Sequence, residues 1–376
     1  MDKSAAVTTP APFACERSWQ ESSCLRRLRR ERFIASFVRP LGFALVTLAV
    51  FYLALCVSGN GLRLTLPLDV ALGKASRAAE VIFYNVRLPR TVTAAVVGAA
   101  LSVAGAVMQN VLRNPLASAS TLGVSQGAAF GAALAIVFFD AGLGADGNLG
   151  SAVTVTSPVF VAASAFVFGL MSGGVVLALS LLTRITSATM ILSGIAMGAM
   201  FAGATALVQY FADDVKVASI VYWTFGDVGR TGWDQIGMLA AALAVMLAYF
   251  QANAWNYNAI SNGTATASSL GVNVGTVLIT GMFAASLLSS IAVAFVGAIS
   301  FVGLIAPHLA RRFVGNDHRQ LLVASAFTGA ILLIGAEVLS RTVVSPSILP
   351  IGAITSFIGA PVFLYMIFRN DGWRKW

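Results

Sequence analysis

The sequence predicts an all-α membrane protein, a polytopic bundle of about ten transmembrane helices. Of its 376 residues, 58% are hydrophobic and only 10% are charged, which is too little charged surface for a soluble globule of this size. Apolar runs long enough to cross a bilayer recur along nearly the whole chain. Lipid is therefore the solvent for most of the expected surface.

Hydropathy divides the chain into ten expected spans, separated by polar or proline-containing breaks. They are residues 37–57, 91–112, 121–139, 153–182, 188–211, 233–252, 275–298, 301–313, 321–339 and 351–368. An even number of spans puts both chain ends on the same side of the membrane. Many spans are rich in glycines, spaced so that helix backbones can approach closely. We interpret this spacing as generic close packing of helices, with a specific dimer seam as the alternative.

Three regions follow from composition. Residues 1–35 are polar, with arginines gathered just before the first span and no apolar core followed by a cleavage site. We expect a basic, cytoplasmic, disordered extension there, a transmembrane domain at 36–370 and a short cytoplasmic tail at 371–376. The net charge of +9 is explained by membrane topology, so no nucleic acid partner is expected.

Positive charge on alternate connections sets the orientation, because cytoplasmic loops carry an excess of lysine and arginine. The residues on one face are the N-terminal arginines, Arg113, Arg184, Arg311, Arg312, Arg319, Arg369, Arg374 and Lys375. This face is the expected cytoplasmic side, which places both termini in the cytoplasm. Arg87, Arg90 and Arg341 are exceptions on the opposite side.

These three arginines lie at the outer start of the second span and the outer end of the ninth, so one outer face can display all three guanidiniums. Such a face suits an acidic partner, since guanidinium groups bind carboxylates bidentately. The alternatives are interfacial snorkelling or a local ion pair between Arg341 and Glu337, four residues earlier. For Glu337 we prefer this structural pair to a proton relay, because no second carboxylate or histidine lies in the surrounding apolar run.

Two features mark the expected cytoplasmic face. Asn114 and Pro115 end the second span in a structured turn, because proline cannot continue the helical hydrogen bonding. The polar, uncharged segment at 256–273 either forms short surface helices that contact a partner or is a bare loop.

Several chemistries are excluded. The three cysteines form no CxxC pair and have no metal-ligand spacing with His308 and His318, so no metal site or bound cofactor is expected. No phosphate loop of the form G-x-x-x-x-G-K-[ST] occurs, so ATP-driven transport needs another chain as its motor. No nucleophile, base and orienting group lie together, and the chain is not expected to be an enzyme.

Ordered sequence blocks over residues 37–368 give the chain a specific resemblance. They are RLPR at 87–90, GAALSVAGAVMQ at 98–109, RNPLA at 113–117, LGVSQGAAFG at 122–131, LSGIAMG at 192–198, YWTFGDV at 222–228, GAISFVGLIAPHLARRFVG at 297–315, NDHR at 316–319 and LPIGAITSFIGAPVF at 349–363. The chain resembles the FecCD-type permease family, the membrane subunits of ABC importers for iron-siderophore complexes, haem and cobalamin.

The resemblance implies a cobalamin-permease-like fold of ten helices that functions as a dimer, with a second copy or a paralogous permease, around a central path. It also implies two ATP-binding subunits that use ATP and Mg, and an extracytoplasmic substrate-binding protein that docks on Arg87, Arg90 and Arg341. The implied ATPase coupling loop comprises Ser261, Asn262, Gly263, Thr264, Ala265, Ser268, Leu270 and Gly271. Thr186 and Ser187 match the cytoplasmic gate. The matching structural motif positions are Gln109, Asn114, Pro115, Pro307, His308, Glu337, Pro350, Gly352 and Pro361.

The chain departs from the family pattern at a few positions. The coupling loop lacks the acidic residues that are usual in the family, Glu337 stands where aspartate is usual, and Ile348 replaces a glutamate. The segment Ser118 to Ser120 also differs from the common Asp-Pro.

The expected function is that of a multi-pass permease subunit in the cytoplasmic (inner) membrane of a bacterium or archaeon. It moves a metal chelate inward, with a ferric siderophore as the base-rate choice and haem or cobalamin as alternatives. The alternative from another class is a proton-coupled secondary transporter, which the scarcity of intramembrane acids disfavours. A structural or signalling membrane subunit without transport is a second rival.

Overall fold

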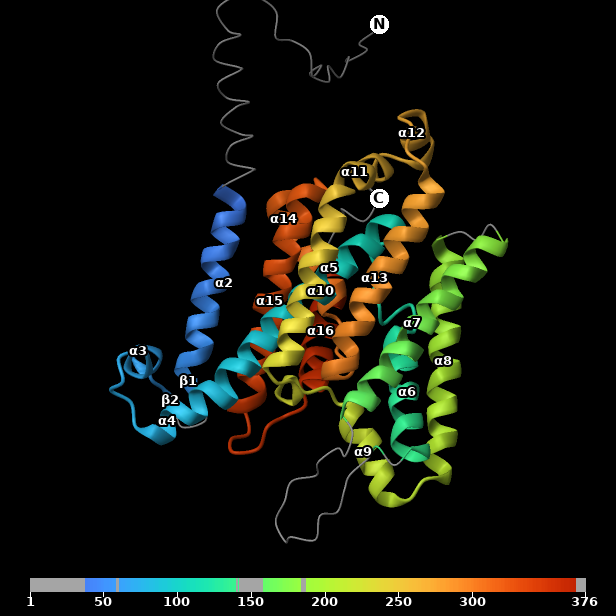
Figure 1. Ribbon diagram of the computed structural model, residues 1–376. Helices are drawn as coiled ribbons and strands as arrows, with labels where there is room; N and C mark the ends of the chain where they lie inside the picture. The colour runs from blue at the N-terminus through green and yellow to red at the C-terminus, as the bar shows by residue number, and fades with distance from the viewer. Residues whose placement is uncertain (1–37, 59–60, 140, 142–157, 184–186, 370–376) are drawn as a thin grey trace, which may run out of the picture.

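A computed structural model describes residues 38–58, 61–139, 141, 158–183 and 187–369 of the chain, and helices dominate it (Figure 1). In chain order the helices are α2 (Arg39–Cys56), α3 (Leu66–Ala71), α4 (Arg77–Ile82), the π-helical turn η2 (Phe83–Arg87), α5 (Leu88–Val111), α6 (Val124–Phe138), α7 (Pro158–Thr183), α8 (Ser187–Phe211), α9 (Asp214–Thr224), the 3₁₀ turn η3 (Val228–Arg230), α10 (Trp233–Ala252), α11 (Ala254–Ser261), α12 (Thr264–Ser269), α13 (Val274–Val296), α14 (Val302–Val314), α15 (His318–Thr342) and α16 (Ile351–Arg369). A two-residue antiparallel pair, β1 (Val57–Ser58) with β2 (Gly61–Leu62), follows α2. The expected extension at 1–35 and tail at 371–376 lie outside the described residues.

Each of the ten expected spans contains one helix, which confirms the prediction of an all-α membrane bundle. Within the described residues, seven helices are long and apolar enough to cross a membrane. The other three expected spans hold shorter helices, α6, α14 and α16, whose apolar stretches fall below that length. α14 has only 13 residues, because the chain turns sharply at Phe301, with a φ of 66°, and again at Gly315, with a φ of 76°.

The second span starts earlier than the sequence analysis predicted. The prediction began at residue 91, but a continuous helical segment runs from Arg77 through η2 to Val111, over 35 residues. Pro89 does not stop this helix, because the π-helical turn before it shifts the hydrogen-bond pattern, so that the Leu88 N–H donates to the Phe83 carbonyl. Arg87 and Arg90 therefore lie inside a helix. Its other end, at Val111, agrees with the expected break before Asn114.

α5 is the central helix of the bundle, flanked by α10, α13, α14 and α15 (Figure 1). In the most apolar 18-residue stretch of the helical segment that ends with α5, 83% of the residues are buried inside the bundle. The corresponding value for α2, which lies at the edge, is 17%. Glycines allow this crowding. A Cβ atom added at Gly98 would lie 2.3 Å from the Gly329 carbonyl oxygen, and one at Gly105 would lie 1.8 Å from the Gly303 carbonyl oxygen. These glycines thus serve packing within the chain, the role that we preferred to a dimer seam.

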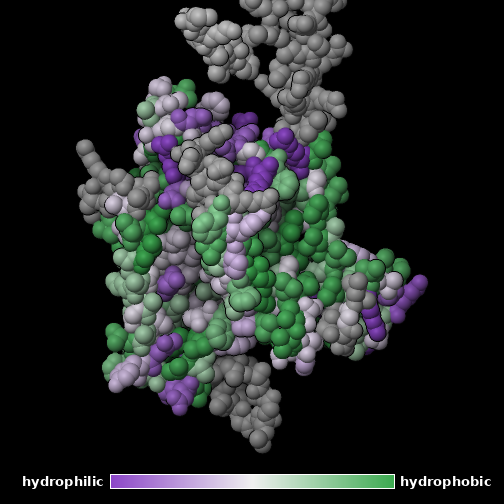
Figure 2. Space-filling view, turned by 180° about the vertical axis from the view of Figure 1, so that it is seen from behind, coloured by the Kyte–Doolittle hydropathy of each residue, from purple (hydrophilic) through white to green (hydrophobic). Residues whose placement is uncertain are grey.

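The outer surface of the bundle is apolar along its sides. Figure 2 shows a mainly hydrophobic band, with hydrophilic residues gathered mostly toward the two ends. Large apolar side chains on the outer helices are exposed, among them Leu48 on α2, Leu207 on α8 and Val245 on α10. One end of the molecule carries α11 and α12 and is called the α12 end. The opposite end carries α3, α4 and α9 and is called the α9 end (Figure 1).

Replacing Gly98 with Ala is expected to destabilise the bundle. The new methyl group would collide with the Gly329 backbone, which cannot rotate away, so the free energy of unfolding should fall by about 2 kcal/mol. The measurement is thermal unfolding of the protein in detergent. Gly335→Ala on α15 is the matched control, because a Cβ atom there meets no atom within 4 Å. Equal unfolding temperatures for the two variants would contradict the role of close packing at Gly98.

Candidate functional site

Five charged side chains meet at the α9 end of the bundle and form what is called here the arginine cluster: Arg87, Arg90, Asp227, Glu337 and Arg341. The helical segment η2–α5 carries the first two arginines, and the last two turns of α15 carry Glu337 and Arg341. Asp227 immediately precedes η3. Segments far apart in the sequence thus bring their charges to one place.

Glu337 lies at the centre of the cluster, with only 1% of its side chain exposed. Its Oε1 atom is 3.2 Å from Nε of Arg341 and 3.6 Å from Nε of Arg90. The local pair that the sequence predicted for Glu337 and Arg341 is therefore confirmed. A buried carboxylate is costly unless cations and hydrogen bonds compensate it. By pairing with both arginines, Glu337 links α15 to α5.

Arg341 also holds the end of α2. Its guanidinium donates to the carbonyl of Val57 at 3.1 Å and to the carbonyl of Ala54. Carbonyl groups at a helix C-terminus lack helical N–H donors, so an arginine is a favourable partner for them. Arg341 thus fastens the edge helix α2 to the end of α15.

Arg90 reaches across to the segment between α9 and α10. Its Nη2 atom is 3.0 Å from Oδ1 of Asp227, and the same oxygen accepts the N–H of Gly229 at 2.8 Å. A Cβ atom at Gly229 would lie 2.1 Å from Nη1 of Arg90, so glycine leaves the space that the guanidinium fills. A hydrogen bond of 2.6 Å between the hydroxyls of Thr93 and Thr231 adds a second link from α5 to this segment.

Arg230 is a charged residue at this end that the sequence analysis did not single out. Its guanidinium lies 4.7 Å from the ring centroid of Tyr222, and it donates to the carbonyl of Trp223 at 3.2 Å and to that of Tyr222. Burial lowers the pKa of Arg230, and the charge of Asp227 partly opposes this shift. Its only sequence signal was its position two residues after the YWTFGDV block.

Arg87, Arg90 and Arg341 were predicted to share one face, and they do lie together in the structure. Their exposure is smaller than expected, because the side chains of Arg90 and Arg341 are only 11% and 12% exposed and donate within the chain. Arg87 is half-buried. Three guanidiniums face two carboxylates, so the cluster keeps an excess of positive charge. Their role in docking a partner stays a prediction.

At the α12 end, the polar segment at 256–273 forms short surface helices, α11 and α12. Of the two predicted possibilities, short helices and a bare loop, the first is therefore confirmed. The residues of the expected coupling loop are exposed or, for Gly263, half-buried. They are Ser261 at the end of α11, the turn residues Asn262 and Gly263, Thr264, Ala265 and Ser268 in α12, and Leu270 and Gly271 after it. Gly263 and Gly271 adopt φ values of 111° and 82°, which glycine reaches without strain.

Two asparagines hold this segment against the bundle. Asn110 on α5 donates to the carbonyl of Tyr257 at 3.2 Å and to the Ser261 hydroxyl at 2.6 Å. On α11, Asn258 accepts the backbone N–H of His318 and donates to the Asp317 carboxylate, both at 2.8 Å. The expected coupling segment, residues 254–271, is thus anchored to α5 and to the N-terminus of α15, the same two helices that carry the arginine cluster at their other ends.

Other motif positions serve the packing of the bundle. Gln109 on α5 donates to the carbonyl of Leu304 on α14 at 3.1 Å, and the Asn114 side chain accepts the N–H of Leu116 at 2.8 Å in the expected turn, which includes Pro115. A Cβ atom at Gly352 would lie 2.5 Å from the carbonyl oxygen of Ala298.

The remaining positions lie on or beside α14, α16 and α8. Pro307 is buried inside α14 and His308 is half-buried next to it, whereas Pro350 directly precedes α16 and Pro361 lies within it. Of the expected gate, Thr186 lies outside the described residues. Ser187 is the first residue of α8, and only its backbone is among the described parts of the structure.

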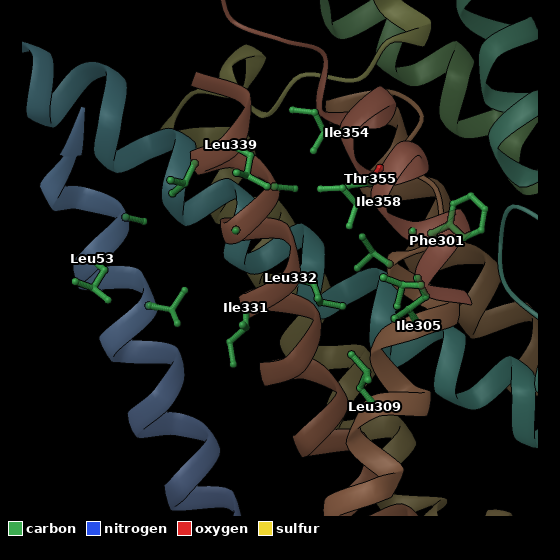
Figure 3. Close-up of a pocket in the computed structure, with 18 of the residues that line it drawn as sticks. Leu53, Phe301, Ile305, Leu309, Ile331, Leu332, Leu339, Ile354, Thr355 and Ile358 are labelled. Atoms are coloured by element: carbon green, nitrogen blue, oxygen red, sulfur yellow. The ribbon is translucent and has the colours of Figure 1, made fainter. Parts of the chain in front are cut away.

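An apolar cavity of about 530 Å³ lies between α2, α14, α15 and α16 (Figure 3). Leu53, Phe301, Ile305 and Leu332 are among its lining residues, and no ionisable side chain lines it. A polar or charged ligand would lose its hydration there without gaining a partner. The cavity therefore does not extend either polar site.

Comparison with known proteins assigns the chain to a family. A family model described as the FecCD transport family matches residues 46–369. The chain belongs to this family. This FecCD protein is 44% identical over 331 residues to a protein named as an ABC transporter permease, MJ0087 of Methanocaldococcus jannaschii, across 87% of this chain and 94% of the relative.

Two further comparisons agree with the assignment. The FecCD chain is 34% identical to the hemin transport system permease protein HmuU of Yersinia pestis, across 89% of this chain and 97% of the relative. It also matches the fold of a metal-chelate type ABC transporter solved in an inward-facing conformation, with a TM-score of 0.75 and 28% identity over 88% of this chain and 99% of that one. The protein is a multi-pass membrane permease subunit of an ABC importer and not an enzyme. The proton-coupled rival is thereby overturned.

Removing the Glu337 carboxylate should destabilise this FecCD permease strongly. Glu337→Ala leaves the guanidiniums of Arg90 and Arg341 buried without their shared partner, which should lower the free energy of unfolding by about 3 to 5 kcal/mol. Thermal unfolding in detergent measures the effect. Glu337→Asp is the control, because it keeps the charge and should recover most of the stability. An alanine variant as stable as the parent protein would show that the pairs contribute little.

Proposed function

We propose that this permease imports a metal chelate, most simply a ferric siderophore, as a homodimer that two ATP-binding subunits drive with ATP and Mg. Among its relatives are permeases named for hemin, vitamin B12 and iron(3+)-hydroxamate import, and these cargoes are all large chelates. The chain itself has no phosphate loop, which supports a separate motor. Haem and cobalamin are the alternative cargoes.

The α12 end is the proposed cytoplasmic side of the membrane. Arg311 and Arg312 lie in the last turn of α14 and Arg319 in the first turn of α15, next to the expected coupling segment, and cytoplasmic ends of membrane helices carry such positive charge. The arginine cluster then faces outward, toward a substrate-binding protein, and both chain termini are cytoplasmic. The proposed location is the cytoplasmic membrane of a bacterium or archaeon.

The observation that carries this proposal is the shared scaffold of the two polar sites. α5 and α15 bear the arginine cluster at one end and hold the coupling segment at the other. Their backbones touch at Gly98 and Gly329, so the two helices move as one body more easily than they slide past each other. Docking of the binding protein outside, and rearrangement of the ATP-binding subunits inside, would both act on the pair of helices α5 and α15. Alternating access would then pass the chelate along the dimer axis and through a gate near Thr186 and Ser187.

Charge reversal at Arg87 should weaken docking of the binding protein. Arg87→Glu turns a cation of the cluster into an anion, and affinity at low salt should fall on the order of tenfold, with a weaker salt dependence. The measurement is binding of the purified binding protein to the permease in nanodiscs during a salt titration. Arg77→Glu on α4 is the control, since it makes the same change in net charge outside the cluster. Equal affinity for both variants would refute the docking assignment.

Uptake identifies the cargo. A deletion strain that keeps the ATPase and the binding protein should regain uptake of labelled ferric siderophore when this chain is restored, and should not regain it with an ATPase variant whose phosphate-loop lysine is replaced. Labelled haem and cobalamin are tested in parallel. Uptake of one of those two alone would replace the siderophore, and uptake of none of the three would contradict the proposed substrate class.

A further inference from the structure

Asp227 differs from the other acid of the arginine cluster in its access to solvent. Both carboxylates contact Arg90, but the side chain of Glu337 is 1% exposed, whereas that of Asp227 is 23% exposed. An acidic group of a docking partner can approach the Arg90 guanidinium only from its accessible side. Asp227 is the more exposed of the two carboxylates that already contact Arg90.

Two carboxylates at one guanidinium edge repel each other, and a partner's acid must therefore compete with Asp227. The ion pair that it must displace is short, with 3.0 Å between Nη2 of Arg90 and Oδ1 of Asp227. Glu337 is sealed inside and keeps Arg90 in place during such an exchange.

Asp227 has a second cation nearby. A small cavity of about 110 Å³ is lined by Asp227, Arg230, Tyr222 and the segment 348–350. It exceeds the ~30 Å³ that one water molecule occupies in the liquid, so it leaves space for a carboxylate to turn. Within the described part of the chain, Nε of Arg230 is buried and has no hydrogen-bond acceptor. Asp227 and the cation of Arg230 thus line the same cavity.

We propose that Asp227 is an internal competitor for the binding protein's acidic residue at Arg90, and that docking moves its carboxylate from Arg90 to Arg230. This inference rests on the proposed docking role of the arginine cluster. Asp227 then sets how tightly, and at what salt concentration, a binding protein is held.

The exchange would also affect two membrane helices, because the backbone around Asp227 is hydrogen-bonded to α13 and α16. The Asp227 N–H donates to the carbonyl of Val296 at the end of α13, at 2.8 Å. The carbonyls of Gly226 and Phe225 accept the N–H groups of Ile351 and Gly352 in the first turn of α16, at 3.2 and 3.1 Å. Phe225 and Gly226, which bond to the first turn of α16, directly precede Asp227, so a backbone shift that accompanies the exchange would reach α16.

The test compares Asp227→Asn with Asp234→Asn in the full-length permease in nanodiscs. Both variants remove one negative charge at the same end, but Asp234 is exposed at the start of α10 and pairs with none of the arginines in the described structure. The probe is the binding protein that supports uptake, at several salt concentrations. Asp227→Asn should tighten docking about fivefold to tenfold, and Asp234→Asn less than twofold. The asparagine oxygen can still accept the Gly229 N–H, so the turn should keep its fold, and thermal unfolding checks this.

Equal docking by the two variants would overturn internal competition, provided that Arg87→Glu still weakens docking. If Arg87→Glu has no effect either, the docking role itself fails, and the inference falls with it.

A double-mutant cycle gives an independent result. Arg230→Gln should weaken docking several-fold when Asp227 is present, because the displaced carboxylate then has no cation to receive it, and should have no effect in the Asp227→Asn background. The same loss in both backgrounds would overturn the proposed exchange.

Discussion

A carboxylate buried between two guanidiniums is the constraint on which the α9 end of this permease depends. Glu337 pairs with Arg341 on its own helix and with Arg90 on α5, and Arg341 in turn holds the last carbonyls of α2. Each of these charges would be costly to bury alone, so each fixes the position of the others. Three helices are therefore joined at a point where apolar packing by itself would leave them free to shift.

Close packing of α5 against α15 fixes the relative position of these two helices between the two ends of the bundle. Lipid supplies no hydrophobic drive for two apolar helices to associate, so close approach at Gly98 and Gly329 provides the packing energy. At the opposite end, Asn110 and Asn258 hold α11, in the expected coupling segment, to the same helices. The two helices thus carry the arginine cluster at one end and the hydrogen bonds to α11 at the other.

The arginine cluster combines two physical demands. Internal pairing of Arg90 and Arg341 stabilises the bundle, whereas recognition of an acidic partner needs positive potential that reaches the solvent. The excess of guanidiniums over carboxylates would meet the second demand under the proposed docking role, and the partly exposed Asp227 is the proposed place where the two compete. In this proposal the same residues are structural in the isolated permease and bind the partner when it docks.

The sequence by itself determined the membrane class, the ten helical segments, the family and the pair of Glu337 with Arg341. These depend on hydropathy, on ordered motifs and on the rise of one helical turn, all of which are local. Only the tertiary structure decided that Arg90 binds Asp227, 137 residues away, that Arg230 caps the end of α9, and that Arg90 and Arg341 are mostly buried. The start of the second span was also missed, because a π-helical turn let the helix continue through Pro89. Charge pairing across the bundle depends on which helices pack together and at what depth, and no local pattern in the sequence encodes either.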